Sequence, residues 1–333
     1  MRIGLLTSVG RTIDAFFQEA VETWLEAGHV VRCAAGTQPA ASVPFDLIEG
    51  LTQRPAPSNV RVPLRLRAWA QEHDLDVIIT NTATASTLAR LAPLPCSLVY
   101  FCHGLHWNRD LHPARLVESA LVRRADSVVT INSDDRAWFA ARHDSVLYLR
   151  EGVGVPRSYP WTQLPTSDAL QLCWAGDFVP RKRPDLAVRA MADVVRLRPG
   201  SHLTMLGDGE LERAAQQLAH DLGVDAAITF AGRTDVRPHI EAAHALLHTA
   251  TWEGLPRILL EGAAMGRQSF AFDVKGVRDV PGARLSPDGD VAALARLITD
   301  NVPQQALDPA IGDAMRSDAV ARRLLDHLES LVG

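Results

Sequence analysis

An alternation of short apolar runs with amphipathic segments constrains the fold of this chain most, because it occurs twice, once in each half. Runs such as 2–8 and 97–103 are rich in branched and aromatic apolar residues and predict buried strands. The segments between such runs, for example 83–91, have the spacing of helices. Strands linked by helices form parallel sheets covered on both faces. We therefore expect an α/β fold with doubly wound sheets.

The expected elements fill both halves. In the first half we expect strands at 2–8, 45–49, 76–81, 97–103, 127–132 and 146–149, and helices at 13–27, 64–73, 83–91, 113–124 and 134–141. Residues 28–34 are expected to form a helix cap followed by a further strand. In the second half we expect strands at 170–176, 201–207, 227–232, 245–250 and 269–273, and helices at 184–198, 210–222, 236–243, from 256 onward, at 290–299 and over most of 306–331.

This pattern predicts two domains, for which 333 residues provide enough chain. Residues 1–155 are expected to form the first Rossmann-like domain and 169–305 the second. Residues 156–168 form the predicted linker, because prolines are frequent there and no periodicity is present. Residues 306–333 are the predicted helical tail.

Composition excludes several classes of protein. The net charge of −5 is spread over both halves and indicates no nucleic-acid partner. The four cysteines have neither metal-site spacing nor a pattern of pairs, which indicates a reducing compartment. No apolar run approaches the length of a membrane span, and the first residues enter a strand directly. We expect a cytoplasmic protein.

The stretch from Trp252 to Glu261 carries the strongest functional signal. It follows the apolar run 245–250, and Pro256 is well placed as a first helical residue. The amides of Arg257 and Ile258 at such a helix start, with the helix dipole behind them, attract a phosphate. Glu253 and Glu261 are acceptor-only carboxylates, suited to sugar and ribose hydroxyls. Together these features predict a nucleotide-sugar site.

The spacing of Glu253 and Glu261 resembles the E-x7-E motif of the retaining GT-B glycosyltransferases of family 4, of the capsule and glycoprotein-glycan type. The resemblance implies the GT-B fold, in which two doubly wound Rossmann-like domains face each other across a cleft and the tail returns to the first domain. It implies that Glu253 contacts the donor sugar and Glu261 the ribose, with the backbone of Gly254, Leu255 and Pro256 near the diphosphate. By spacing alone, an ordinary amphipathic helix with a solvated Glu remains an alternative.

The loop 176–184 places Arg181, Lys182 and Arg183 beside a helix start, where cations neutralise a diphosphate. In the family an Arg directly after the glycine and a Lys a few residues later share this task. Lys182 matches that Lys, but Asp177 stands where the Arg is usual, so Arg181 or Arg183 is expected to replace it. An exposed basic loop without a ligand is the alternative.

Two further strand ends resemble the family's nucleotide site. Gly207 and Asp208 match its Gly-Asp-Gly turn, and Arg233 and Thr234 lie where family backbones bind the base, often uracil. A later segment, 276–279, resembles less specifically one near the donor sugar. The ends of parallel strands meet at one edge of the sheet, so these residues are expected to lie together.

In the first half, Gly10 alone remains of the family's glycine-rich loop, and His103 follows a strand as in the family's His-Gly motif. With Glu253, His103 is our candidate catalytic residue, placed to bind a sugar hydroxyl or a developing phosphate charge. We interpret His106 and His112 as structural. A basic cluster, Arg61, Arg65, Arg67, Arg115, Arg123 and Arg124, is compatible with contact with an anionic membrane, although nearby acidic residues favour a mixed, solvated surface.

The predicted reaction moves a sugar from a nucleotide sugar, with a UDP-sugar as first choice, to an acceptor hydroxyl with retention, in polysaccharide or glycoconjugate biosynthesis. The acceptor is a saccharide, a lipid-linked saccharide or a small molecule. We expect no cofactor and no metal, because the Asp-x-Asp sequences 74–76 and 288–290 lie before a strand and at a helix cap, respectively. A UDP-sugar epimerase or hydrolase and a non-catalytic nucleotide-sugar-binding subunit are the alternatives.

Overall fold

The computed structural model describes residues 1–105 and 113–333, and these residues form two compact units. The first unit contains residues 1–154 and 317–333, and the second contains residues 155–316. His106 and His112 lie outside the described residues. Within the described part of the chain, every helix is too short or too polar to cross a membrane.

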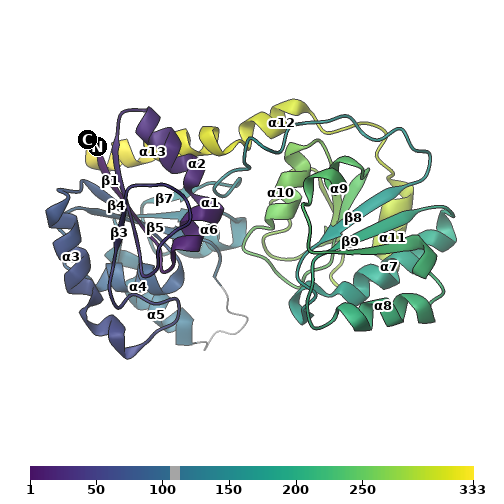
Figure 1. Ribbon diagram of the computed structural model, residues 1–333, viewed down its shortest axis with the longest axis horizontal. Helices are drawn as coiled ribbons and strands as arrows, with labels where there is room; N and C mark the ends of the chain where they lie inside the picture. Colours follow the sequence, from purple (N-terminus) through teal and green to yellow (C-terminus); the bar gives the residue numbers. More distant parts are fainter. Residues whose placement is uncertain (106–112) are drawn as a thin grey trace. The chain divides into compact units, whose positions relative to one another are not determined.

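The first unit is built on a parallel sheet of seven strands in the order β3-β2-β1-β4-β5-β6-β7 (Figure 1). Its strands are β1 Arg2–Leu6, β2 Val30–Ala35, β3 Phe45–Leu47, β4 Val77–Asn81, β5 Ser97–Cys102, β6 Ser127–Thr130 and β7 Val146–Tyr148. Its helices are α1 Gly10–Phe16, α2 Gln18–Glu26, η1 Pro57–Arg61, α3 Val62–Glu72, α4 Ala83–Leu91, α5 Pro113–Leu121, η2 Val122–Arg124, α6 Ser133–Ala140 and α13 Ser317–Val332. Strands β1, β4, β5 and β6 form its buried centre.

Helices cover both faces of this sheet. Helices α3, α4 and α5 are neighbours on one face, and α2 and α13 pack together on the other (Figure 1). The single helix predicted at 13–27 is two helices, α1 and α2, because the backbone leaves the helical conformation at the buried Phe17.

The second unit has a parallel sheet of six strands in the order β10-β9-β8-β11-β12-β13. Its strands are β8 Gln171–Ala175, β9 His202–Leu206, β10 Ile228–Gly232, β11 Ala245–His248, β12 Gln268–Phe272 and β13 Ala283–Ser286. Its helices are η3 Pro180–Lys182, α7 Pro184–Leu197, α8 Glu212–Asp221, η4 Asp225–Ala227, α9 Arg237–Glu241, α10 Arg257–Ala264, α11 Val291–Asp300 and α12 Pro309–Ala314. Strand β13 was not predicted, because its four residues are only partly apolar and lie at the edge of the sheet.

The division into units differs in detail from the predicted boundaries. The segment 156–168, predicted as a linker, belongs to the second unit. The Arg267 side chain explains this packing, because its buried guanidinium donates to the carbonyls of Thr162 at 2.8 Å and Gln163 at 2.8 Å and to Thr162 Oγ1 at 2.7 Å. The predicted tail is divided as well, since 306–316 belong to the second unit and only 317–333 to the first.

Candidate functional site

The carboxyl ends of β8, β9 and β10 lie side by side because three glycines allow close contact between them. Gly176 N donates to Leu206 O at 3.0 Å, and Gly207 N donates to Gly232 O at 2.8 Å. A Cβ atom on Gly207 would lie 2.0 Å from Gly176 O, and its φ of +121° also favours glycine. The loops that follow these strands therefore start from adjacent positions, as predicted.

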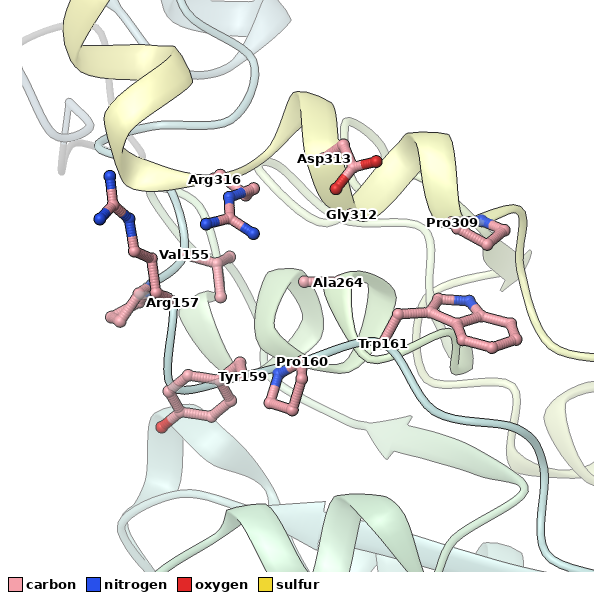
Figure 2. A pocket seen from close by; sticks show the side chains of 11 residues that line it. Val155, Arg157, Tyr159, Pro160, Trp161, Ala264, Pro309, Gly312, Asp313 and Arg316 are labelled. Carbon is pink, nitrogen blue, oxygen red and sulfur yellow. The ribbon is translucent and has the colours of Figure 1, made fainter.

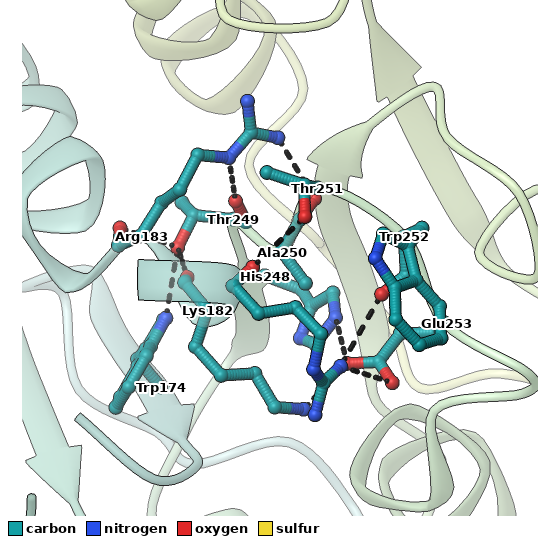
Figure 3. Close-up of polar contacts among 10 residues, drawn as sticks. Trp174, Lys182, Arg183, His248, Thr249, Ala250, Thr251, Trp252 and Glu253 are labelled. Atoms are coloured by element: carbon teal, nitrogen blue, oxygen red, sulfur yellow. Dashed lines mark hydrogen bonds and ion pairs between the residues drawn. The ribbon is translucent and has the colours of Figure 1, made fainter. Parts of the chain in front are cut away.

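Glu253 is the centre of a dense polar cluster at the end of β11 (Figure 3). Its carboxylate is 8% exposed and pairs with Arg181 Nη1 at 2.8 Å and Lys182 Nζ at 2.5 Å. His248, the last residue of β11, places Nε2 3.4 Å from the same carboxylate. The structure thus brings together Glu253, Arg181 and Lys182, three of the residues that the sequence predicted for the site. His248 was not predicted, because a histidine inside an apolar strand reads as core.

The electrostatics of this cluster favour an ionised glutamate. Burial raises the pKa of Glu253, but the hydrogen bond from His248 and the charge of Lys182 outweigh burial and lower the pKa to about 2. Burial also lowers the pKa of His248, which favours its neutral form. Glu253 is therefore a fixed carboxylate that accepts hydrogen bonds.

Arg183 stabilises the loop that contains Glu253. It adopts a left-handed conformation with φ of +49° and precedes α7. Its guanidinium donates to the carbonyls of Thr249 at 2.6 Å and Ala250 at 2.8 Å (Figure 3). It also pairs with Asp288 at 2.6 Å. Thr249 also accepts a hydrogen bond from Trp174 Nε1 at 3.0 Å. This geometry favours a structural role for Arg183 over the predicted contact with a donor.

Helix α10 holds Glu261. The helix begins at Arg257, so Pro256 is its N-cap residue and not, as predicted, its first helical residue. Glu261 is 8% exposed and lies 3.4 Å from Arg257 Nη2. Burial raises its pKa, which Arg257 only partly offsets. Gly254 and Leu255, in the loop before this helix, are half-buried.

The loop after β12 supports Glu253 from another side. Glu253 N donates to Lys275 O at 3.0 Å. Gly276 has φ of +79°, and a Cβ there would lie 2.5 Å from Glu253 O. The predicted segment 276–279 is thus next to the Glu253 backbone, and Arg278 in it pairs with Asp273 at 2.9 Å.

Charged side chains also follow the ends of β8, β9 and β10. Arg233 pairs with Asp208 at 2.7 Å and with Asp177 at 3.1 Å, and all three side chains are exposed. Thr234, the next residue, is exposed as well. The predicted residues Gly207, Asp208 and Arg233 are therefore neighbours, and Asp177 joins them.

In the first unit, Gly10 begins α1 and packs against the backbone of Gln38 and Pro39, where a Cβ would lie 2.3 Å from Pro39 N. Close packing accounts for this glycine. His103 follows β5 and lies among three aromatic rings, with ring centroids 4.9 Å from Phe101 and 5.3 Å from Phe16. Both residues lie after the ends of strands in their sheet, as expected.

Side chains of both Asp-x-Asp sequences bind other groups within the protein. Asp290 accepts a hydrogen bond from Ala293 N at 2.9 Å and caps α11, as expected. Asp288 pairs with Arg183, and Asp76 accepts from Arg2 N at 2.7 Å. These carboxylates therefore have partners within the protein.

A pocket of 160 Å³ lies in the second unit between residues 155–161 and the segment 309–316 (Figure 2). Tyr159, Arg316 and Ala264 of α10 are among the lining residues. Burial and the charge of Glu261 raise the pKa of Tyr159 to about 12. Sequence patterns did not reveal this pocket, because segments far apart in the sequence, 155–161 and 309–316, form it.

Comparisons with known families and proteins cover most of the chain. The family described as glycosyl transferase 4-like domain matches residues 12–147, and the family described as glycosyl transferases group 1 matches residues 169–301. The lipopolysaccharide core biosynthesis glycosyltransferase LpsE of Rhizobium meliloti is 32% identical over 265 residues, which cover 75% of this chain and 72% of LpsE.

A second relative is the GDP-mannose-dependent alpha-(1-6)-phosphatidylinositol monomannoside mannosyltransferase of Mycobacterium tuberculosis, at 28% identity over 82% of each chain. Among solved structures, Anabaena HepE in complex with UDP has a TM-score of 0.81 at 17% identity, covering 99% of this chain and 100% of HepE. The lipopolysaccharide outer core galactosyltransferase WaaB has a TM-score of 0.79 at 17% identity, covering 99% of each chain. These likenesses extend over both units.

Proposed function

Because this chain belongs to the group 1 glycosyltransferases and has the GT-B fold of two Rossmann-like units, we propose that it transfers a hexose from a UDP-sugar to an acceptor hydroxyl with retention of configuration. The carboxyl edge of the second unit's sheet is the proposed donor site. The proposed reaction needs no metal and no cofactor.

The observation that carries this proposal is the cluster around Glu253. A buried, ionised carboxylate beside Arg181 and Lys182 offers an acceptor for sugar hydroxyls and two cations for a diphosphate. The cations stabilise the charge that develops on the leaving diphosphate, so they favour the transition state over the bound substrate. Glu261 and the backbone at Gly254 and Leu255 complete the proposed contacts to ribose and diphosphate.

The first unit is proposed to bind the acceptor, with His103 as the residue that positions its hydroxyl. The aromatic rings around His103 hold the imidazole in place at the end of β5. Retention is proposed from the resemblance of the Glu253 and Glu261 spacing to the retaining family. The leaving phosphate is then the group that takes the acceptor proton.

The relatives support two donor nucleotides. HepE was crystallised with UDP, whereas the mycobacterial relative is named as dependent on GDP-mannose. We propose UDP first and GDP second. LpsE, named for lipopolysaccharide core biosynthesis, supports an acceptor that is a saccharide or a lipid-linked saccharide in polysaccharide or glycoconjugate biosynthesis.

The test is an assay of the full chain with UDP-, GDP- and dTDP-sugars, with and without saccharide and lipid-linked acceptors. The proposal predicts product only when an acceptor is present, and NMR of the product should show the anomeric configuration of the donor. Release or interconversion of sugar without acceptor would instead indicate a hydrolase or an epimerase. Binding without turnover for every pair would indicate a non-catalytic subunit.

A variant links the assay to the site. Glu261→Ala should weaken binding of the preferred nucleoside diphosphate, measured by calorimetry, because the ribose hydroxyls lose their acceptor. Unchanged affinity in this variant would contradict the proposed site even if transfer is observed.

A further inference from the structure

At the carboxyl edge of the second unit's sheet, the proposed donor site, Arg233 forms a specific set of hydrogen bonds with Asp177 and Asp208. Arg233 Nε donates to Asp208 Oδ2 at 2.9 Å, and its Nη2 donates to Asp208 Oδ1 at 2.7 Å and to Asp177 Oδ1 at 3.1 Å. A bidentate pair with a planar guanidinium fixes both the position and the orientation of the arginine. Two loops from neighbouring strands therefore hold one guanidinium.

These contacts use only one side of the guanidinium. They involve Nε and Nη2, and within the described residues the two N–H groups of Nη1 have no acceptor. The Arg233 side chain is 68% exposed. The structure thus presents a fixed cation with two donors available to a ligand in the second unit.

The guanidinium of Arg233 lies beside Asp177, a position at which this chain differs from the family that it resembles. In the family that the chain resembles, the residue after the first glycine of this unit is an arginine for the diphosphate, and here it is Asp177. The Lys182 side chain packs on Gly176, with its Cδ and Cε 3.5 Å from the position of a Gly176 Cβ. The guanidinium of Arg233 therefore lies at the Asp177 carboxylate, one residue from the glycine that Lys182 covers.

We propose that Arg233 binds the donor diphosphate in place of the arginine missing at position 177, and that Asp177 and Asp208 hold it there. This inference rests on the proposed function, because it assigns a role within the same donor site. It differs from the expectation for this segment, in which the backbone at 233–234 meets the base.

The cluster contains two carboxylates and one guanidinium, so its net negative charge opposes binding of a phosphate. Both carboxylates are more than half exposed, and water and salt screen exposed charges strongly. Their hydrogen bonds to Nε and Nη2 leave Nη1 for a phosphate. A phosphate at Nη1 makes a short-range, charge-assisted hydrogen bond, which screening weakens less than it weakens distant repulsion.

The test measures the affinity of the full chain for UDP by calorimetry. The affinity for uridine is measured in the same way, by competition with UDP. Arg233→Gln should lower the affinity for UDP about tenfold, the effect of one charge-assisted hydrogen bond at an exposed site, and leave uridine binding unchanged. Adding Asp177→Arg to this variant should restore most of the UDP affinity. If wild type prefers GDP, the same comparison uses GDP and guanosine.

Arg196→Gln is the matched control, because Arg196 also forms an exposed pair in this unit, with Asp193 at the far end of α7. It should bind UDP as wild type does. Three results would overturn the role of Arg233 but not the proposed function. These are wild-type UDP affinity in Arg233→Gln, an equal loss of affinity for UDP and uridine, and no recovery of UDP affinity in the double variant. A wild-type protein that binds no nucleoside diphosphate would overturn the proposed function itself.

Discussion

Glu253 has two consequences that can be measured separately, one for stability and one for catalysis. Its folded pKa of about 2 lies below the ordinary value of 4.5, so its ion pairs stabilise the fold above pH 4.5. This stabilisation is lost as pH falls from 4.5 toward 2, when the carboxylate is protonated in the folded state. The stability of wild type should therefore decrease over this interval.

The variant Glu253→Gln isolates this contribution. It should melt at a lower temperature than wild type at pH 7, because Lys182 and Arg181 lose their buried partner. The difference in melting temperature between the two proteins should shrink between pH 4.5 and pH 3. A difference that stays constant with pH would mean that the charge of Glu253 does not stabilise the fold.

The same substitution should reduce sugar transfer about a hundredfold or more, the usual cost of removing one electrostatic contact to a reacting group. Rates measured at saturating donor are the relevant quantity, because they separate transfer from binding. Gln keeps the shape of the side chain, so retained activity would exclude an essential role for the Glu253 charge.

Arg267 is the residue on which the packing of the predicted linker depends. Besides Thr162 and Gln163, its guanidinium donates to the carbonyls of Ile240 at 3.2 Å, Met265 at 2.6 Å and Glu241 at 3.0 Å. Replacing Arg267 with Met leaves several buried carbonyls without donors, each at a cost of about 1–3 kcal/mol. We expect a loss of about 3 kcal/mol or more, measured as a lower urea midpoint.

The exposed Arg284 provides the comparison for this prediction. It lies on β13 and binds Gln268 at 2.8 Å and Asn301 at 2.9 Å. Arg284→Met should change the urea midpoint little, because water replaces these exposed contacts. Equal midpoints for the two variants would show that burial of Arg267 is not what stabilises this segment.

At the scale of elements, the position of α10 depends on close contact with β11. A Cβ on Gly262 would lie 2.2 Å from Leu246 Cδ1, so helix and strand touch where the glycine lacks a side chain. Gly262→Ala should shift α10, and with it the neighbouring Glu261. We expect a net destabilisation of about 1–2 kcal/mol, because overpacking outweighs the gain in helix propensity.

The Gly262→Ala variant should also bind the donor more weakly. The Michaelis constant for the donor is expected to rise several-fold, since Glu261 is the proposed ribose contact. A matched change is Gly289→Ala, at a glycine whose Cβ would meet nothing within 4 Å, although its φ of +76° costs some stability. If both variants raised the Michaelis constant equally, the close contact between α10 and β11 would not be the cause.

We propose that the layer formed by α3, α4 and α5 contacts an anionic membrane, the lesser of the two interpretations that the sequence left for its basic cluster. Large apolar side chains are exposed beside the basic cluster predicted from the sequence: Leu64, Leu91, Leu116 and Val117 on these helices, and Val60 on the preceding η1. Glu118, one of the nearby acidic residues, is buried in an ion pair with Arg90, so it does not offset the surface arginines. Apolar and basic side chains together fit an anionic lipid surface.

The double change Leu116→Asp and Val117→Asp should therefore reduce binding to vesicles of anionic phospholipid in a sedimentation assay. The control is Leu197→Asp on α7, since Leu197 is 57% exposed and Leu116 is 63% exposed. Binding should also weaken with salt and with neutral vesicles. Equal loss in the control, or no binding by wild type, would contradict the proposed membrane contact.

Elements with a strong pattern were predictable from the sequence, and those shaped by neighbours were not. The buried strand predicted at 76–81 is β4 Val77–Asn81, because a continuous apolar run has few other solutions. The break at Phe17 between α1 and α2 was missed, since the amphipathic pattern continues through it. Arg233 lies 56 residues from Asp177, and no local pattern reports a pair at that separation.

On the scale of the whole chain, the second unit is an insertion between two parts of the first. Helix α13 completes the first unit: Trp24 Nε1 donates to Ala321 O at 3.0 Å, and Ser127 Oγ lies 2.7 Å from His327 Nε2. The sequence predicted a helical tail from its periodicity, but its return to the first domain came only from the family resemblance. Contacts across almost 300 residues have no local signature.

Leu328 tests how far the first unit depends on this helix. Its side chain is fully buried in α13, so Leu328→Asp places a carboxylate in an apolar interior and should lower the melting temperature of the first unit strongly. Hydrogen exchange should accelerate in α2 and β6, which α13 contacts, but not in β8 or β11 of the second unit. Asp326→Ala, at an exposed position of the same helix, should leave both units unchanged. If exchange accelerated equally in both units, the chain would unfold as one cooperative body, and the division at residues 154 and 317 would not describe its stability.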